Sequence, residues 1–258
     1  KYNTLGTDGK IYYSPETVDT SGINYNRQIF CASANVFLVE NSYADSSWNE
    51  IQTLTASNGA SDDNFGFSVD VNKNVVVVGA PLTDPGGQMG AGTGYIYVFE
   101  DSSWTEKIIA LPIDGNTLVG AKFGWSTAIN KNNVILFGAP QQSNSVGGRE
   151  GAVYIYDYDC NNLWEQTEKI IGNYRDYFGF SISINDNNTF SVGATANSDI
   201  TPDFGDGSGN VTIFSYSRKH DRSILIDSSV NILDPSSNDG ISTNNLFGYS
   251  VFIDNYVL

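Results

Sequence analysis

Short apolar segments separated by polar turns run along most of the chain. Residues 67–71 alternate apolar and polar side chains, as expected of a strand with one polar face. Residues 75–78 are four valines in a row, which favours a strand buried on both faces. Residues 94–100 and 104–111 add two further segments of β-type composition. The pattern therefore predicts four short antiparallel strands rather than helices.

The same set of four segments recurs along the chain. The second set covers residues 125–129, 134–137, 152–156 and 164–171. The third set covers residues 180–184, 189–192, 210–216 and 223–233. Three strands of an earlier set are predicted within residues 28–55, and the first strand of a later set at 249–253. Four antiparallel strands per repeat, without a helix between them, are typical of one blade of a β-propeller.

A short motif, Phe-Gly-x-Ser, opens each set. Its phenylalanine lies at positions 65, 123, 178 and 247, which are 58, 55 and 69 residues apart. A period of this size indicates a repeat architecture. A second motif, Gly-Ala-Pro, follows at 79–81 and 138–140 and becomes Gly-Ala-Thr at 193–195. We expect the phenylalanine to pack between adjacent blades and the glycines to allow their backbones to approach closely.

Taken together, these motifs resemble FG-GAP repeats. In the first complete set the resemblance is carried by Phe65-Gly66-Phe67-Ser68-Val69, Val77-Val78-Gly79-Ala80-Pro81, Gly94-Tyr95-Ile96-Tyr97-Val98-Phe99-Glu100 and Ser102-Ser103-Trp104. It covers roughly residues 28–258. The resemblance implies an all-β fold, the β-propeller found in integrin α-subunits and in many extracellular proteins, which usually has seven blades.

The repeats divide the chain into one propeller region, residues 1–258. A partial blade is predicted at 28–56, complete blades at about 65–121, 123–175 and 178–235, and the first strand of a further blade at 247–258. The pattern does not place residues 1–27. These segments amount to about four blades, which we interpret as part of a seven-bladed ring. The alternative is a closed four-bladed ring, in which the strand at 249–253 joins the three strands at 28–55.

The chain has 29 Asp and Glu residues against 13 Lys and Arg residues, and its net charge is −16. The acidic residues are scattered along the chain, which indicates a solvated surface. Because nucleic-acid binding needs a basic footprint, no nucleic-acid partner is expected. No apolar run is long enough to cross a bilayer, so no transmembrane segment is predicted. No leader-like segment opens the chain, and the resemblance implies an extracellular or cell-surface protein whose secretory signal has been removed.

Many FG-GAP proteins bind calcium in the turn between the two motifs, through an Asp-rich loop that supplies the oxygen ligands. Here the corresponding turns, residues 72–74, 130–133 and 185–188, are rich in Asn and poor in carboxylates. We therefore expect no calcium site in these turns and no cofactor. A weak metal candidate remains in a glycine-rich loop, formed by Asp199, Asp203 and Asp206. The alternative reading of that loop is a flexible acidic segment.

The sequence gives little support to catalysis. The one histidine, His220, lies in a charged segment, and no nucleophile elbow or metal-binding spacing is present. Cys31 and Cys160 fall in different repeats, so we interpret them as two inert thiols. The chain is therefore predicted not to be an enzyme.

Three long loops, residues 82–93, 141–151 and 195–209, all follow the second strand of a repeat. They should therefore cluster on one face of the propeller, where binding residues are commonly carried. The predicted partner-binding residues in these loops are Asp84, Gln88, Gln141, Asn144, Arg149 and Asp203. The alternative is that the loops are insertions which the fold merely tolerates.

Two Asn-x-Thr sequons make Asn187 and Asn210 candidate glycosylation sites. Asn187 lies in a predicted hairpin, whereas Asn210 opens a strand. Chance occurrence in a chain rich in Asn is the alternative.

From these observations we predict a non-catalytic, integrin-like extracellular propeller that mediates adhesion by binding a protein or glycan partner. The alternative is a structural building block of an extracellular filament or surface assembly, formed by copies of the same chain or by different chains.

Overall fold

The computed structural model describes eleven segments of the chain, which are residues 3–5, 11–13, 27–32, 35–42, 47–113, 119–143, 148–158, 163–195, 209–219, 224–233 and 247–255. Side chains are described from residue 50 onward, with residue 233 excepted.

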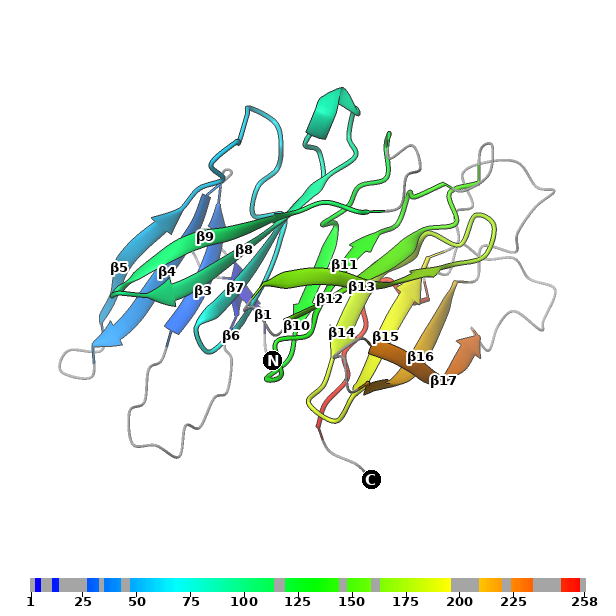
Figure 1. Cartoon of the computed structure of the whole chain (residues 1–258). Helices are drawn as coiled ribbons and strands as arrows, with labels where there is room; N and C mark the ends of the chain where they lie inside the picture. Colours follow the sequence, from blue (N-terminus) through cyan, green and yellow to red (C-terminus); the bar gives the residue numbers. More distant parts are fainter. Residues whose placement is uncertain are drawn as a thin grey trace.

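Strands dominate the structure and form consecutive antiparallel sheets (Figure 1). Sheet 1 has the order β3 (Arg27–Ala32), β4 (Asn35–Ser42), β5 (Ser47–Leu54). Sheet 2 has the order β6 (Ser68–Asn72), β7 (Val75–Ala80), β8 (Thr93–Glu100), β9 (Ser103–Ala110). Sheet 3 has the order β10 (Ser126–Ile129), β11 (Ile135–Ala139), β12 (Ala152–Tyr158), β13 (Trp164–Ile171).

Sheet 4 has the order β14 (Phe178–Ile184), β15 (Thr189–Ala194), β16 (Asn210–Arg218), β17 (Ile224–Leu233). A hairpin of β1 (Asn3–Leu5) and β2 (Ile11–Tyr13) precedes the four sheets, with β2 beside β3. The described part of the chain has no α-helix, only one short 3-10 turn, η1 (Pro85–Gly87). The predicted all-β fold with four-stranded antiparallel blades is therefore confirmed, while the seven-bladed ring stays a prediction.

The sheets stand side by side, with their first strands in contact (Figure 1). Strand β6 contacts β10, and β10 contacts β14. We call the end at which these first strands begin the upper face, and the end that carries the β6–β7, β10–β11 and β14–β15 hairpins the lower face. Loops that follow the second strands therefore leave from the upper face.

The second strands of sheets 2 and 3, β7 and β11, are buried along their whole length because both of their faces meet an apolar layer. Every residue of β7 is buried. Val76 and Val78 pack with Leu54 of sheet 1, whereas Val75 and Val77 pack in the core shared with sheet 3. Because successive side chains of β7 point to opposite faces of the sheet, this one strand contributes to two cores. This explains the unbroken apolar run in the sequence.

Each Phe-Gly motif lies at the junction with the preceding sheet. Phe123 has no exposed surface and packs between Val77 of sheet 2 and Tyr154 of sheet 3. Fully burying a side chain of this kind contributes about 1.5–3 kcal/mol. The phenylalanine thus packs between blades, as its motif predicted.

The two motifs meet across the junction in a backbone contact that only glycine permits. A β-carbon added to Gly79 would overlap the carbonyl oxygen of Gly124, and the pairs Gly138–Gly179 and Gly193–Gly248 repeat this contact. The serine of Phe-Gly-x-Ser completes the contact from the preceding sheet. Its hydroxyl donates to the same carbonyl, at 2.8 Å from Ser68, 2.7 Å from Ser126 and 2.7 Å from Ser181.

Two local expectations differ from the structure. Strand β6 is half-buried along its whole length, because the first strands lie against one another rather than against water. Its Asp70 side chain accepts a hydrogen bond from the backbone of Ile129, at 3.0 Å. The strand expected at 249–253 is also absent, since residues 251–254 have no regular structure and no described strand pairs with them.

Candidate functional site

The upper face is built from paired segments that repeat from junction to junction. In the loop between β7 and β8, Gly90 and Ala91 accept backbone hydrogen bonds from Lys122 and Phe123, at 3.2 and 2.8 Å. Gly92, Gly151 and Gly209 each form a parallel bridge with the phenylalanine of the next Phe-Gly motif. The start of each blade is thereby fixed to a loop of the preceding blade, which gives the upper face a rigid base.

The predicted partner-binding residues that the structure describes lie on this face. Asp84 is exposed, and its carboxylate accepts the Gly90 backbone N–H at 2.7 Å, so it shapes its own loop. Gln88 is half-buried in that loop, and the half-buried Gln141 donates its backbone N–H to the Ala121 carbonyl at 3.2 Å. Arg149 is exposed. Asn144 and Asp203 lie outside the described residues.

Four aromatic rings form a continuous strip along the first strands. They lie two residues after each motif phenylalanine, and we call them the aromatic strip, comprising Phe67, Trp125, Phe180 and Tyr249. Successive ring centroids are 4.6, 5.4 and 5.0 Å apart. Phe67 and Tyr249 are 47% and 57% exposed, so the strip presents apolar surface to solvent near the upper face.

A second group on this face is formed where the loop between β11 and β12 meets the segment before β14. We call it the arginine–tyrosine turn, comprising Arg149, Tyr174, Arg175 and Tyr177. The Arg149 guanidinium donates to the Tyr177 hydroxyl at 2.6 Å and lies over its ring. Arg175 lies over the ring of Tyr174, which is 51% exposed.

Other polar groups of the upper face hold its segments together. Glu106 accepts hydrogen bonds from the Ser57 backbone, at 3.0 Å, and from the hydroxyl of Tyr97, at 3.1 Å. Burial, with the charge of Glu106 as a smaller cause, raises the pKa of Tyr97 far above its usual value. Burial also raises the pKa of Tyr95 to about 12, so both phenols stay protonated at neutral pH. Burial lowers the pKa of Lys122, an effect that nearby Asp84 opposes.

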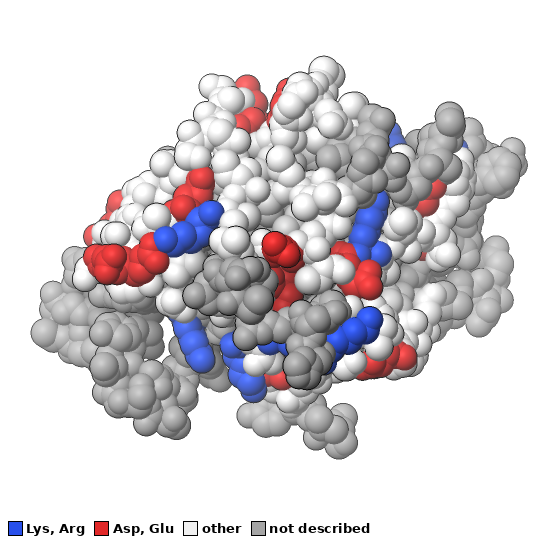
Figure 2. Space-filling view, viewed as in Figure 1, with Lys and Arg blue, Asp and Glu red and all other residues white. Residues whose placement is uncertain are grey.

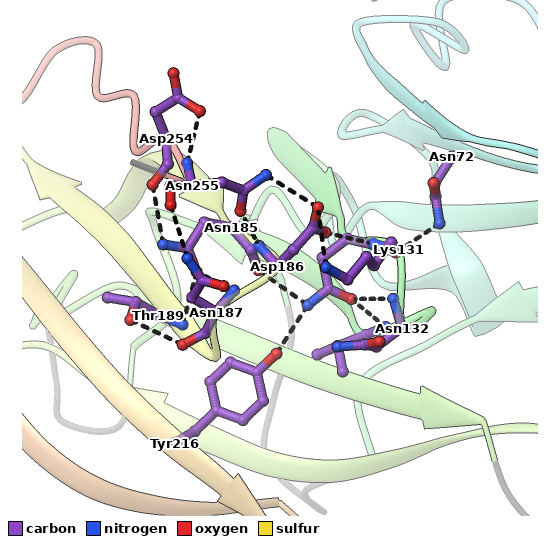
Figure 3. Close-up of polar contacts among 12 residues, drawn as sticks. Asn72, Lys131, Asn132, Asn185, Asp186, Asn187, Thr189, Tyr216, Asp254 and Asn255 are labelled. Atoms are coloured by element: carbon purple, nitrogen blue, oxygen red, sulfur yellow. Dashed lines mark hydrogen bonds and ion pairs between the residues drawn. The ribbon is translucent and has the colours of Figure 1, made fainter. Parts of the chain in front are cut away.

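The lower face carries a different repeated feature, a ladder of amides between hairpins (Figure 3). Asn72, Asn130 and Asn185 lie seven residues after their motif phenylalanines. Each side-chain amide donates to the backbone carbonyl at the same position of the next repeat, at 2.7, 3.1 and 3.1 Å, and the last acceptor is Asp254. We call these four residues the asparagine ladder.

Two ladder residues, Asn130 and Asn185, also close their own hairpins. The Asn130 side-chain oxygen accepts the backbone N–H groups of Asn132 and Val134, at 3.0 and 3.1 Å. The same amide nitrogen donates to the Tyr216 hydroxyl at 2.8 Å. The turns at the family's calcium position are thus stabilised by amides. Burial raises the pKa of Tyr216 to about 12, which keeps this hydroxyl protonated.

Metal ligands and catalytic groups are sparse in the described residues. Among them, no group of three or more His, Cys, Asp or Glu side chains is placed to hold a metal ion. The weak candidates Asp199, Asp203 and Asp206 lie outside the described residues, as do His220 and Cys160. Cys31 lies in β3, with its side chain also outside the description. The described residues include no helix long and apolar enough to span a membrane.

The two sequon asparagines differ in accessibility. Asn187 is exposed on the lower face, and its amide donates to the backbone carbonyl of Asn255 at 2.8 Å. Asn210 begins β16 and is only 8% exposed. A glycan on Asn187 would extend into solvent, whereas a glycan on Asn210 would have to displace the packing around β16.

The fold and its junctions define the class of protein. Successive four-stranded antiparallel sheets, joined through their first strands, are the blades of a β-propeller. The sequence model described as FG-GAP repeat matches residues 48–99 and 104–156. These two segments are thus FG-GAP repeats, as their motifs predicted. A search of the curated proteins found no match.

The two matched segments do not coincide with the sheets. The first contains most of β5 followed by β6 to β8, and the second begins in β9 and runs into β12. One sequence repeat therefore joins the outer strand of one blade to the first three strands of the next. Each sequence repeat therefore contributes strands to two adjacent blades and links them covalently.

Sequence reasoning missed three sets of residues at these junctions, although a signal for each was present. The aromatic strip and the asparagine ladder lie at fixed distances, two and seven residues, after each motif phenylalanine. The third set consists of positions with left-handed backbone just before the motif, such as Arg175 and Tyr177. Comparing residues at equal distances from the motif would have found all three.

Proposed function

We propose that this chain is a non-catalytic, extracellular recognition module that binds a protein or glycan partner at its upper face. FG-GAP repeats are common in extracellular proteins, which supports the location. The observation that supports this binding site is that exposed apolar side chains of the first strands and of an upper-face loop lie at the same end of the sheets. The exposed rings of Phe67 and Tyr249 lie near the base of loops that carry Met89, itself 69% exposed.

Aromatic and Met side chains are typical of binding surfaces because aromatic rings offer large, rigid contact areas and flexible Met adapts to the shape of a partner. The backbone beneath them is fixed by the hydrogen bonds of each junction, so little ordering is required on binding. On the face seen in Figure 2, acidic and basic side chains are interspersed, with no single basic area. This arrangement supports a partner other than a nucleic acid.

The test is a binding screen of the full chain against extracellular proteins and glycans, followed by variants of the upper face. We expect Phe67→Ser combined with Met89→Ser to weaken binding to any partner found by about tenfold or more, since central apolar contacts carry most of the affinity. The matched control is Leu163→Ser on the lower face, which removes a side chain that is 50% exposed. Equal loss in the control and the upper-face variant would contradict the proposal.

A second candidate function, a building block of an extracellular assembly, is favoured by one face of sheet 4. Val211 pairs with Ile232 and Ile213 pairs with Val230, so these four apolar residues share one face. Val230 and Ile232 are 63% and 42% exposed, and Val211 and Ile213 are half-buried. By contrast, Val153 and Ile155 of sheet 3, which correspond to Val211 and Ile213, are fully buried against sheet 4.

An exposed apolar sheet face is a common site of association. Sedimentation velocity of the full chain distinguishes the two functions. A concentration-dependent assembly that Val230→Lys dissociates would favour the building block, whereas a monomer that still binds its partner would favour recognition.

A further inference from the structure

The arginine–tyrosine turn can be compared directly with the equivalent junction one repeat earlier. Gly151 and Gly92 both bridge the next motif phenylalanine, so Arg149 corresponds to Gly90. The backbone bond from Arg175 to Gly148, at 3.1 Å, corresponds to that from Gly120 to Met89, at 2.8 Å. Tyr177 similarly corresponds to Lys122. The two junctions therefore share one backbone geometry and differ in their side chains.

At these positions the backbone φ is positive, in the left-handed region that favours glycine. In the earlier junction φ is +59° at Gly90 and +73° at Gly120, and a glycine adopts these values without strain. In the later junction arginines occupy both of these glycine positions, with φ of +50° at Arg149 and +62° at Arg175. The third position is left-handed with a large side chain in both junctions, at +62° in Lys122 and +55° in Tyr177. Large side chains at such positions cost folding free energy, and residues held in this way concentrate at functional sites.

The Arg149 side chain is positioned but remains accessible. Its guanidinium is fixed on one side by the Tyr177 hydroxyl and ring, and the residue is exposed. A guanidinium has five N–H donors, and the bond to Tyr177 uses only one of them. The remaining donors face solvent in a geometry that suits the two oxygens of a carboxylate or sulfate.

The two carboxylates of the same turn are buried or half-buried, and Asp176 is the half-buried one. Asp176 accepts hydrogen bonds from the backbone and the side chain of Asn173, at 3.0 and 2.8 Å. Glu150 is only 8% exposed. The turn therefore presents two cationic groups, the exposed Arg149 and the half-buried Arg175, on a chain whose net charge is −16.

An exposed aromatic ring lies on the segment that pairs with the Arg149 loop, where the Arg175 backbone N–H donates to the Gly148 carbonyl at 3.1 Å. Tyr174 is 51% exposed, and Arg175 lies over its ring with 5.2 Å between the guanidinium carbon and the ring centroid. A flat ring held in this way matches the apolar face of a pyranose, on which the C–H groups are gathered. The net charge of −16 would repel a polyanion, so a ligand with a single acidic group fits this surface better.

We infer that the arginine–tyrosine turn is a binding site for a saccharide that carries one acidic group, either a carboxylate or a sulfate. Arg149 binds the acidic group, Tyr174 packs against the sugar ring, and Tyr177 positions the guanidinium. This inference rests on the proposed recognition function and assigns a ligand class to one part of the upper face.

The test is a titration of the full chain with three matched disaccharides, one neutral, one with a uronate and one sulfated, followed by calorimetry or saturation-transfer NMR. We expect at least one acidic disaccharide to bind about tenfold or more tightly than the neutral one. Comparing the uronate with the sulfated disaccharide then shows whether the site prefers a carboxylate or a sulfate. Arg149→Gln should weaken binding of that acidic form about tenfold or more and leave the neutral form unchanged. Lys73→Gln, the same charge change on the lower face, is the control and should have no effect.

Stability measurements separate binding from a merely structural role of the side chain. Arg149→Gly relieves the left-handed backbone, so we expect its thermal midpoint to be no lower than that of the wild type while binding of the acidic disaccharide is lost. Tyr177→Phe, which removes the positioning hydroxyl, should weaken binding severalfold and less than Arg149→Gln does.

Several outcomes would overturn the inference. These are equal binding of the neutral and acidic disaccharides, no binding of either acidic form, undiminished binding by Arg149→Gln, or tighter binding of an acidic peptide of the same charge. The saccharide site can fail while the proposed recognition function stands. That outcome requires that the double variant Phe67→Ser, Met89→Ser loses binding to a different partner.

Discussion

At the scale of single residues, the junction between blades depends on a contact between two glycines. Gly138 faces the carbonyl oxygen of Gly179, and the Ser126 hydroxyl donates to that oxygen at 2.7 Å. The carbonyl is therefore bound and enclosed by the preceding sheet. A side chain larger than hydrogen at position 138 has to push the next blade away.

We predict that Gly138→Ala destabilises the fold by about 1–3 kcal/mol, because the added methyl group overpacks the junction. The measurement is the free energy of unfolding in urea. Gly59→Ala is the matched control, since its added β-carbon meets no atom closer than 3.2 Å and the residue is exposed. If both variants lose the same free energy, the contact between glycines does not determine the stability of the junction.

At the scale of elements, the first strands of neighbouring sheets are joined at both ends. The motif contact lies at the upper face, and the asparagine ladder joins the hairpins at the lower face (Figure 3). Hydrogen bonds to the Asp186 side chain also join neighbouring hairpins and reinforce the ladder. Asp186 accepts from the Lys131 backbone at 2.9 Å and from the Asn255 side chain at 3.0 Å.

We predict that Asn130→Ala costs about 2–4 kcal/mol, because several buried backbone groups lose their partner at once. Unfolding in urea measures this loss. Asn132→Ala, on the exposed part of the same hairpin, is the control and should change stability by less than about 0.5 kcal/mol. A loss in Asn130→Ala no larger than in the control would contradict a role for the ladder.

The strands were predictable from the sequence because each junction repeats the same apolar pattern. The predicted segment 164–171 coincides with β13, and the valines at 75–78 lie within β7. Composition predicts a strand at 249–253, yet a strand also requires a partner with which to exchange hydrogen bonds. Composition alone does not supply that partner.

At the scale of the whole molecule, the lower face is held by amides and backbone carbonyls at the position where family members bind calcium. Among the described residues, no cluster of acidic side chains is placed to hold a metal ion there. Two of the hairpins are closed by their ladder residues, such as Asn185, whose side-chain oxygen accepts the backbone N–H groups of Asn187 and Thr189 at 2.9 and 3.0 Å. In the turns of Asn130 and Asn185, amide oxygens therefore already accept the backbone N–H groups.

We therefore predict that removing divalent cations leaves the described blades equally stable. The thermal midpoint of the full chain should be the same, within about 1 °C, in excess chelator and in millimolar calcium, since a ligand bound only to the folded state would raise it. A clear rise with calcium would show a site elsewhere. The loop that contains Asp203 would then be the first segment to test, by Asp203→Asn.

The sequence by itself determined the blade, its four strands, the two-sided burial of β7 and the packing role of the Phe-Gly motif. These features follow from local alternation and from a repeat that is visible at fixed spacing. The tertiary structure alone decided which side chains meet across the junctions. Asn72 and Asn130 are 58 residues apart in sequence, and Arg149 and Tyr177 are 28 apart, so their bonds depend on how one blade is placed against the next. No local pattern specifies that placement, because it is set by the close approach of two glycines and the burial of one phenylalanine at each junction.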